Sequence, residues 1–119
     1  MVYLILAPEL DRVKIGKSND VFARLKTLQT GHSELLCLIG ALDRPDSFEN
    51  ELHERFKSFQ LRGEWFVMCP EIAKFVLFEM SYADKPQSGI ESAFKCLQRH
   101  CPEYVRKIVD AVKQLGIIA

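Results

Sequence analysis

The feature that most constrains the fold is the order in which short apolar runs and helical patterns follow one another over the first 68 residues. The runs from Val2 to Leu6 and from Val13 to Gly16 are apolar and rich in β-branched side chains, and turn formers lie between them. Such a pair predicts an antiparallel hairpin. The full order of predicted elements is strand, strand, helix, strand, helix, strand. This order indicates a small α/β domain of the α+β type.

The first predicted helix begins after Ser18-Asn19-Asp20, which offers several N-cap residues. Val21, Leu25 and Leu28 recur at helical spacing, and Gly31 is placed to end the helix. The sequence therefore predicts a short amphipathic helix directly after the hairpin.

A continuous apolar run over residues 35–42 predicts a central strand that is covered on both faces. Pro45 stands where the first turn of a second helix begins, and Phe48, Leu52, Phe56 and Phe59 recur along one face. Residues 64–68 are aromatic and β-branched enough to form a closing strand. We therefore expect a largely antiparallel sheet of three to four strands flanked by helices.

Residues 69–119 have a different character, which predicts a helical C-terminal extension after a first domain at 1–68. Pro70 can open a helix, residues 82–89 form a predicted loop, and two more helices follow, broken near Pro102. Their apolar positions suggest a surface for a protein partner or a homodimer; these are Val105, Ile108, Val112 and Leu115.

Composition limits the possible classes of function. The chain has 119 residues, 48% of them hydrophobic and 27% charged, as expected of one folded domain. The formal net charge is +0, which counts against tight DNA binding over the whole surface but leaves room for a local basic face. The apolar start of the chain is short and runs into Pro8 and Glu9, so neither a signal peptide nor a membrane span is expected.

The four cysteines are expected to be free thiols in a reducing, cytoplasmic compartment, because they form no Cys-x-x-Cys pair. One cluster contains Cys96, His100 and Cys101. It matches no standard zinc spacing and offers only three ligands on one helix. Ordinary buried or surface thiols are the expected outcome.

Five polar side chains lie where they can meet over the predicted sheet. Antiparallel pairing can bring Tyr3 and Lys14 together on one face of the hairpin. Arg24 lies three residues after Val21, at the border of the face that the first helix buries. Glu49 has the same border position on the second helix, and His53 follows it by one helical turn.

These residues belong to five blocks whose order resembles the GIY-YIG nuclease superfamily. The resemblance is closer to a phage and bacterial branch often labelled a DNA-binding domain, in which the second motif reads Lys-Ile-Gly. It covers about residues 1 to 68, and the ordered set is more specific than any one block. The blocks are Val2-Tyr3-Leu4-Ile5, Lys14-Ile15-Gly16-Lys17-Ser18, Arg24-Leu25 with Leu28-Gln29-Thr30-Gly31, Phe48-Glu49 with Leu52-His53, and Arg62-Gly63-Glu64-Trp65-Phe66.

The resemblance implies cleavage of DNA with one divalent metal ion, Mg²⁺ or Mn²⁺. It implies that Tyr3 is a general base, that Lys14 replaces the tyrosine of the second motif, and that Gly16 leaves room for the phosphate backbone. Arg24 corresponds to the arginine that stabilises charge on the phosphate, and Glu49 to the single metal ligand.

A hard cation such as Mg²⁺ binds through few carboxylates and keeps several waters, so one glutamate suffices. A cation beside a phenol favours the phenolate, so Lys14 can assist Tyr3. His53 is an accessory group in this scheme. Contacts to the DNA strand are expected from Lys17, Lys26, Lys57 and Arg62.

Simpler interpretations remain open for the same residues. Tyr3 can be a packing tyrosine, the lysines can be solvated, and Arg24 can pair with Glu49 as a structural ion pair. Two other functions also remain open: a DNA-binding or regulatory module without catalysis, and a protein-interaction factor that uses the C-terminal helices.

Overall fold

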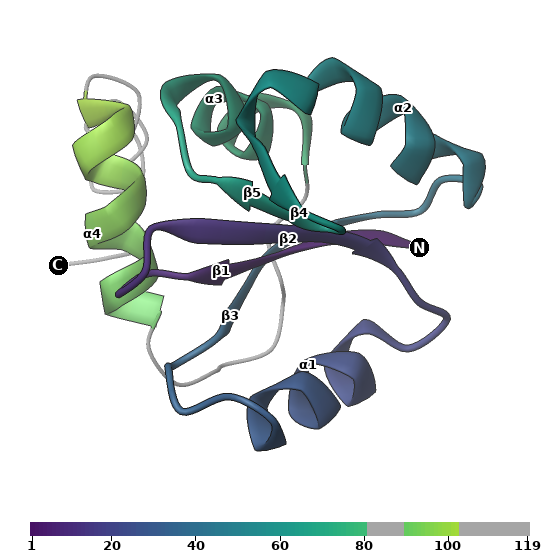
Figure 1. Ribbon diagram of the computed structural model, residues 1–119, viewed down its shortest axis with the longest axis horizontal. Coiled ribbons are helices and arrows are strands. Elements are labelled where there is room, and N and C mark those ends of the chain that lie inside the picture. Colours follow the sequence, from purple (N-terminus) through teal and green to yellow (C-terminus); the bar gives the residue numbers. More distant parts are fainter. Residues whose placement is uncertain (81–89, 103–119) are drawn as a thin grey trace, which may run out of the picture.

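The architecture was obtained as a computed structural model, which describes residues 1–80 and 90–102. Five antiparallel strands form one sheet in the order β3-β1-β2-β5-β4 (Figure 1). The strands are β1 (Val2–Ala7), β2 (Arg12–Lys17), β3 (Cys37–Leu42), β4 (Gln60–Arg62) and β5 (Trp65–Val67). The helices are α1 (Val21–Thr30), α2 (Ser47–Arg55), α3 (Pro70–Glu79), α4 (Ile90–His100) and the short 3₁₀ helix η1 (Lys57–Phe59). The predicted fold class is thereby confirmed.

Strand β1 is buried along its whole length, because helices cover both faces of the sheet. Tyr3, Ile5 and Ala7 point into a cluster with the apolar residues of α1. Val2, Leu4 and Leu6 point into a larger cluster on the opposite face, with residues of α2, α3 and α4. Figure 1 shows α1 on one side of the sheet and α2 and α3 on the other. Alternation of side chains along one strand therefore separates two hydrophobic cores.

The predicted hairpin is confirmed, and its register places Tyr3 opposite Gly16 and Ile5 opposite Lys14. Residues directly opposite in an antiparallel pair share one face of the sheet. Tyr3, Gly16 and Lys14 therefore lie on the face that α1 covers, as the sequence predicted for Tyr3 and Lys14.

Two features of the sheet differ from the prediction. Strand β3 is an edge strand, not a central one, and pairs with β1 alone. Its apolar run reflects burial of both faces, since Cys37 and Ile39 join one cluster and Leu36 and Leu38 join the other. The sheet also has a strand that was not predicted, β4, because its three residues are all exposed and give no apolar signal.

The helix boundaries follow the predicted signals with small shifts. Helix α1 has Asp20, one of the three candidate residues, as its N-cap, and Gly31, the predicted stop, as its C-cap. Helix α2 ends at Arg55, so Phe56 and Phe59 lie beyond it, although Phe56 still packs in the larger cluster. The predicted helix from Pro70 corresponds to α3, with Pro70 in its first turn.

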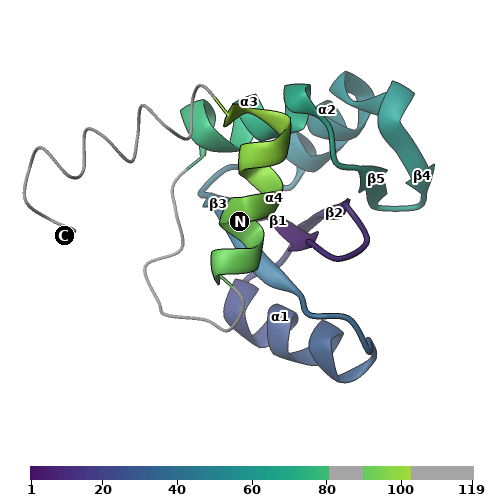
Figure 2. The same cartoon turned by 90° about the vertical axis from the view of Figure 1, so that its left-hand side faces the viewer.

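Helices α3 and α4 pack in the same cluster as the strands. Phe75 and Val76 of α3 and Cys96 and Leu97 of α4 are all nearly inaccessible to solvent. Figure 2 shows α4 in front of the strands, at the end of the sheet where the β1–β2 turn lies. The boundary at residue 68 remains a prediction. The predicted loop at 82–89 and the predicted last helix fall on residues 81–89 and 103–119, outside the described part of the chain.

Within residues 1–80 and 90–102, each helix is too short or too polar to cross a lipid bilayer.

The N-cap of α1 gives a first test of the fold. The Asp20 carboxylate accepts a hydrogen bond of 3.1 Å from the backbone N–H of Ala23. Asp20→Ala removes this bond, so we expect the free energy of unfolding to fall by about 1 kcal/mol in urea titrations. Asp20→Asn, which keeps an accepting oxygen, should change it by much less. An equal loss in both variants would show that the cap does not act through this bond.

Candidate functional site

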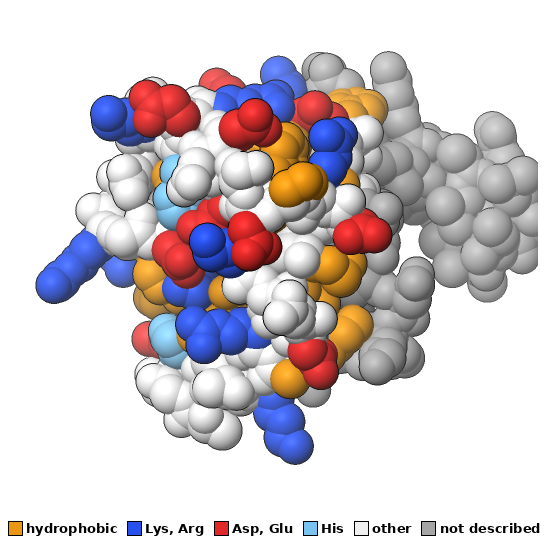
Figure 3. Space-filling view, turned by 90° about the vertical axis from the view of Figure 1, so that its right-hand side faces the viewer, with side chains coloured by type: hydrophobic (Ala, Val, Ile, Leu, Met, Phe, Trp, Pro, Cys, Tyr) orange, Lys and Arg blue, Asp and Glu red, His pale blue; other side chains and the backbone are white. Residues whose placement is uncertain are grey.

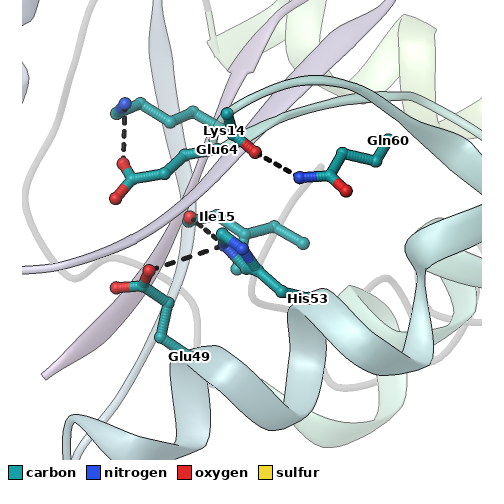
Figure 4. Close-up of polar contacts among 7 residues, drawn as sticks. Lys14, Ile15, Glu49, His53, Gln60 and Glu64 are labelled. Carbon is teal, nitrogen blue, oxygen red and sulfur yellow. Dashed lines mark hydrogen bonds and ion pairs between the residues drawn. The ribbon is translucent and has the colours of Figure 1, made fainter.

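The polar site lies where strand β2 loses its neighbour in the sheet. Strand β5 pairs with β2 only from Arg12 to Lys14, and a last backbone bond of 2.9 Å joins Ile15 N–H to the carbonyl of Glu64. The carbonyl of Ile15 instead accepts a hydrogen bond of 2.9 Å from His53 Nε2 (Figure 4). Because a carbonyl only accepts, Nε2 is the protonated nitrogen in this contact. This hydrogen bond attaches helix α2 to the part of β2 that β5 does not pair with, the open edge of β2.

Glu49 lies one helical turn before His53, and its carboxylate is buried with a single weak partner. Its side chain is 9% exposed, and Oε1 lies 3.6 Å from His53 Nε2. In the described part of the chain, Glu49 Oε2 is the one buried side-chain oxygen or nitrogen without a hydrogen-bond partner. Most such atoms in proteins are satisfied, so this oxygen needs an explanation.

The surroundings of Glu49 raise the pKa of its carboxyl group. Burial is the largest cause, and the negative charge of Glu64 acts in the same direction. The charges of His53, Lys17 and Lys14 oppose the shift but do not cancel it. Two lysines, a histidine and a second carboxylate are therefore near enough to act on the charge of Glu49; of these, the sequence had not assigned Glu64 to the site.

Lys14 forms an ion pair with Glu64, with 2.8 Å between Nζ and Oε2. Its Nζ also lies 5.7 Å from the centre of the Trp65 ring. The turn that presents Glu64 is held by a 2.7 Å bond from Gln60 Nε2 to the carbonyl of Gly63, whose φ of 57° suits glycine. The sequence did not assign Glu64 to the site. The block Arg62-Gly63-Glu64-Trp65-Phe66 contained it, and only the fold of β4 and β5 brings it to Lys14.

Tyr3 is 1% exposed and packs against Gly16. A Cβ atom added to Gly16 would overlap the hydroxyl and Cζ of Tyr3. Glycine at this position therefore makes room for the phenol, whereas the family resemblance implies that it makes room for a phosphate group. A packing tyrosine usually keeps its hydroxyl at the surface, whereas the whole side chain of Tyr3 is buried.

The structure does not bring all five predicted residues over one face. Arg24 is exposed on α1, on the face opposite to α2, and no ion pair joins it to Glu49 among the described residues. A border position on a helix does not reveal which face of the sheet that helix covers. Tyr3 and Lys14 share the face that α1 covers, whereas Glu49 and His53 approach from α2 on the other face; the charge of Lys14 still acts on Glu49 at the open edge of β2.

The four predicted DNA contacts are all exposed but lie on separate elements. Lys17 ends β2 close enough to Glu49 to affect its pKa. Lys26, Lys57 and Arg62 belong to α1, η1 and β4. In Figure 3, side chains of Lys and Arg are interspersed with those of Asp and Glu. This mixture agrees with a net charge of +0.

The residues present fit a single divalent cation at Glu49. An ionised carboxylate oxygen without a hydrogen-bond donor has its lone pairs available, and hard cations such as Mg²⁺ prefer oxygen ligands. A cation there would offset the cost of burying the charge, which the raised pKa reflects.

The fold and this cluster define a small α+β domain with an acidic and basic site at a sheet edge. A family model, the T5orf172 domain, matches residues 1–81, and the chain belongs to that family. Neither the comparison with curated proteins nor that with solved structures gave a match.

The contact between Tyr3 and Gly16 predicts a specific sensitivity to an added methyl group. Gly16→Ala must displace the buried ring, so we expect the free energy of unfolding to fall by about 1 to 3 kcal/mol. Gly31→Ala is the matched control, because its Cβ would meet only the Leu28 carbonyl oxygen at 3.7 Å. Chemical denaturation measures both. Equal stability of the two variants would contradict the packing described.

The raised pKa of Glu49 predicts a pH-dependent effect on stability. The folded state holds the Glu49 proton more tightly than the unfolded chain does. This contribution to stability is complete below the usual pKa of 4.5 and is lost as pH rises through the folded pKa. Without added metal, Glu49→Gln should therefore be more stable than the wild type at neutral pH, and the difference should vanish in acid.

Urea titrations from pH 3 to 8 measure this effect. Glu54→Gln, on the exposed side of the same helix, is the control and should show no such trend. A Glu49→Gln variant that loses stability on raising the pH as much as the wild type would refute the assignment.

Proposed function

We propose that this protein hydrolyses phosphodiester bonds in DNA with one divalent cation, Mg²⁺ or Mn²⁺, at Glu49. The observation that carries the proposal is the buried Glu49 oxygen without a hydrogen-bond partner, next to His53 and within the electrostatic reach of Lys14 and Lys17. Hydrolysis of a phosphodiester needs positive charge at the phosphoryl oxygens and an activated water. A cation held by this carboxylate, together with the charges of Lys14 and Lys17 that act on it, can supply the first of these requirements.

The ordered motifs of the chain support the same reaction through their resemblance to GIY-YIG nucleases. We infer that the T5orf172 domain here is a divergent member of that superfamily. A bound cation would supply Lewis-acid charge that stabilises the phosphate and the leaving oxyanion. The residues themselves bind and orient: Glu49 holds the cation, and Lys17 adds charge at the rim.

His53 acts as a positioning residue in this proposal. Its Nε2–H donates a hydrogen bond to the Ile15 carbonyl, and the ring packs edge-on against Phe66 with 5.0 Å between centroids. Both contacts hold α2 against β2 and so fix the place of Glu49. Tyr3 is the proposed general base, and its hydroxyl must reach water beside Gly16 for that role.

A second candidate function is DNA binding without cleavage. It is favoured by the burial of Tyr3 and by the position of Lys14, whose Nζ pairs with Glu64. A phenol that is 1% exposed has little access to water. Arg24 and Tyr3 both lie on the face of the sheet opposite to α2, so their proposed roles with Glu49 require DNA to reach around the sheet edge.

The deciding experiment is a cleavage assay on supercoiled, linear and single-stranded DNA with Mg²⁺ or Mn²⁺. The wild type should cut, and Glu49→Gln should lose about a hundredfold or more in rate. Tyr3→Phe should also lose activity if the phenol is the base. Glu54→Gln should cut like the wild type, because Glu54 is exposed and outside the site.

Binding measured beside cleavage separates the two candidates. Glu49→Gln should retain affinity for DNA while losing turnover. A folded wild type that binds DNA in a salt-dependent way but cuts no substrate with either metal would select the second candidate.

A further inference from the structure

A second cluster of polar groups lies away from Glu49, where α4 meets the β1–β2 turn (Figures 1 and 2). Asp11 is in this turn, and Cys96 and His100 lie one helical turn apart on α4. Asp11 Oδ1 accepts hydrogen bonds from Cys96 Sγ at 3.1 Å and from His100 Nε2 at 2.8 Å. The three polar atoms all lie within 4.8 Å of one another.

We propose that Asp11, Cys96 and His100 form a Zn²⁺ site that joins α4 to the β1–β2 turn. A thiolate, an imidazole and a carboxylate are the three side-chain ligand types that Zn²⁺ prefers. Three protein ligands leave a fourth position for water or another group. The proposal is independent of the function proposed for Glu49.

The distances suit such a site after small shifts in both directions: the two separations from Asp11 Oδ1 must lengthen, and that between Cys96 Sγ and His100 Nε2, which lies within 4.8 Å, must shorten. Tetrahedral Zn²⁺ has bonds of about 2.0 to 2.3 Å, which place its donor atoms about 3.3 to 3.6 Å apart. The two hydrogen-bonded separations would each lengthen by about half an ångström. Cys96 would release its proton to solvent, and a neutral His100 would carry its proton on Nδ1 instead of Nε2.

The ligands are held by the fold rather than by one another alone. Asp11 has a φ of 55°, which asparagine and aspartate tolerate better than most residues, and its carbonyl accepts a 2.9 Å bond from Met68 N–H. Cys96 is 1% exposed, and Leu97 beside it packs in the larger cluster. A preformed arrangement reduces the cost of collecting ligands around an ion.

Access for an ion exists on the Asp11 side. The side chain of Asp11 is 42% exposed and that of His100 is 18% exposed. The guanidinium of Arg99 lies 3.6 Å from Asp11 Oδ1 and also interacts with the Cys96 thiol, on a side chain that is 65% exposed. Binding of Zn²⁺ would replace this exposed ion pair, which is worth little.

A nucleophilic cysteine is the competing interpretation of the same three residues. Burial, followed by the bond to Asp11, raises the pKa of Cys96 to about 11. The thiol also donates to the carboxylate, whereas a nucleophile needs to give its proton to a base such as the imidazole. The direction of this hydrogen bond argues against a nucleophile paired with the imidazole. The raised pKa disfavours the thiolate in either role, and Zn²⁺ binding would have to offset it.

Titration of the full chain with Co²⁺, followed by displacement with Zn²⁺, tests the site. We expect one saturable Co²⁺ with the strong near-ultraviolet absorption of a thiolate ligand and the visible bands of tetrahedral cobalt. Cys96→Ser should abolish the thiolate band. Asp11→Asn and His100→Gln should weaken binding at least tenfold.

The controls separate this site from other thiols and from Glu49. Cys69→Ser removes a buried thiol outside the cluster and should leave the spectrum unchanged, as should Glu49→Gln. Asp11→Asn keeps an oxygen acceptor and the tolerance for a positive φ, so this variant should fold. Zn²⁺ should raise the melting temperature of the wild type but not that of Asp11→Asn.

Two results would overturn the proposal. A titration without saturation shows that the three groups form a hydrogen-bonded contact only. A thiolate band that survives Cys96→Ser, or disappears in Cys69→Ser, places the ion elsewhere.

Discussion

Burial of β1 on both faces is the constraint from which the rest of the structure follows. All six of its residues are removed from solvent, so the strand needs a pairing partner on each edge and a helical layer on each face. The hairpin with β2 supplies one edge and fixes the register, which puts the Tyr3 ring over Gly16. Since a slip by one residue would exchange the two hydrophobic clusters, this register is strongly specified.

The polar site forms around a backbone carbonyl of β2 that is not paired within the sheet. Strand β5 is too short to pair with all of β2, so the Ile15 carbonyl needs another donor and receives it from His53. That bond holds α2 at the sheet edge, and the preceding turn of the same helix then places Glu49 in a buried position. A carboxylate oxygen without a donor is a cost that a purely structural helix would avoid. Features that break a local rule in this way are concentrated at functional sites.

Local signals predicted the local structure well. The N-cap Asp20, the end of α1 at Gly31 and the shared face of Tyr3 and Lys14 all depend on neighbouring residues or on one hairpin. The sequence failed where the answer depends on how elements pack. An apolar run predicts that both faces of a strand are covered, but not whether the strand is central or, like β3, at an edge. Helix periodicity does not predict which face of the sheet α1 or α2 covers. Glu64 and Asp11 were missed for the same reason: Asp11 is 85 residues from Cys96 and 89 from His100.

The packing of α4 has a consequence for how such a domain can be moved between proteins. Similarity to the family ends at residue 81, yet Cys96, Leu97 and Cys101 fill the same core as β1 and α3. A recombination event that transferred only the matched segment would leave an apolar surface open to water. Any new host protein would have to cover that surface with a helix of its own. The unit that recombination can exchange is therefore larger than the unit that sequence similarity outlines.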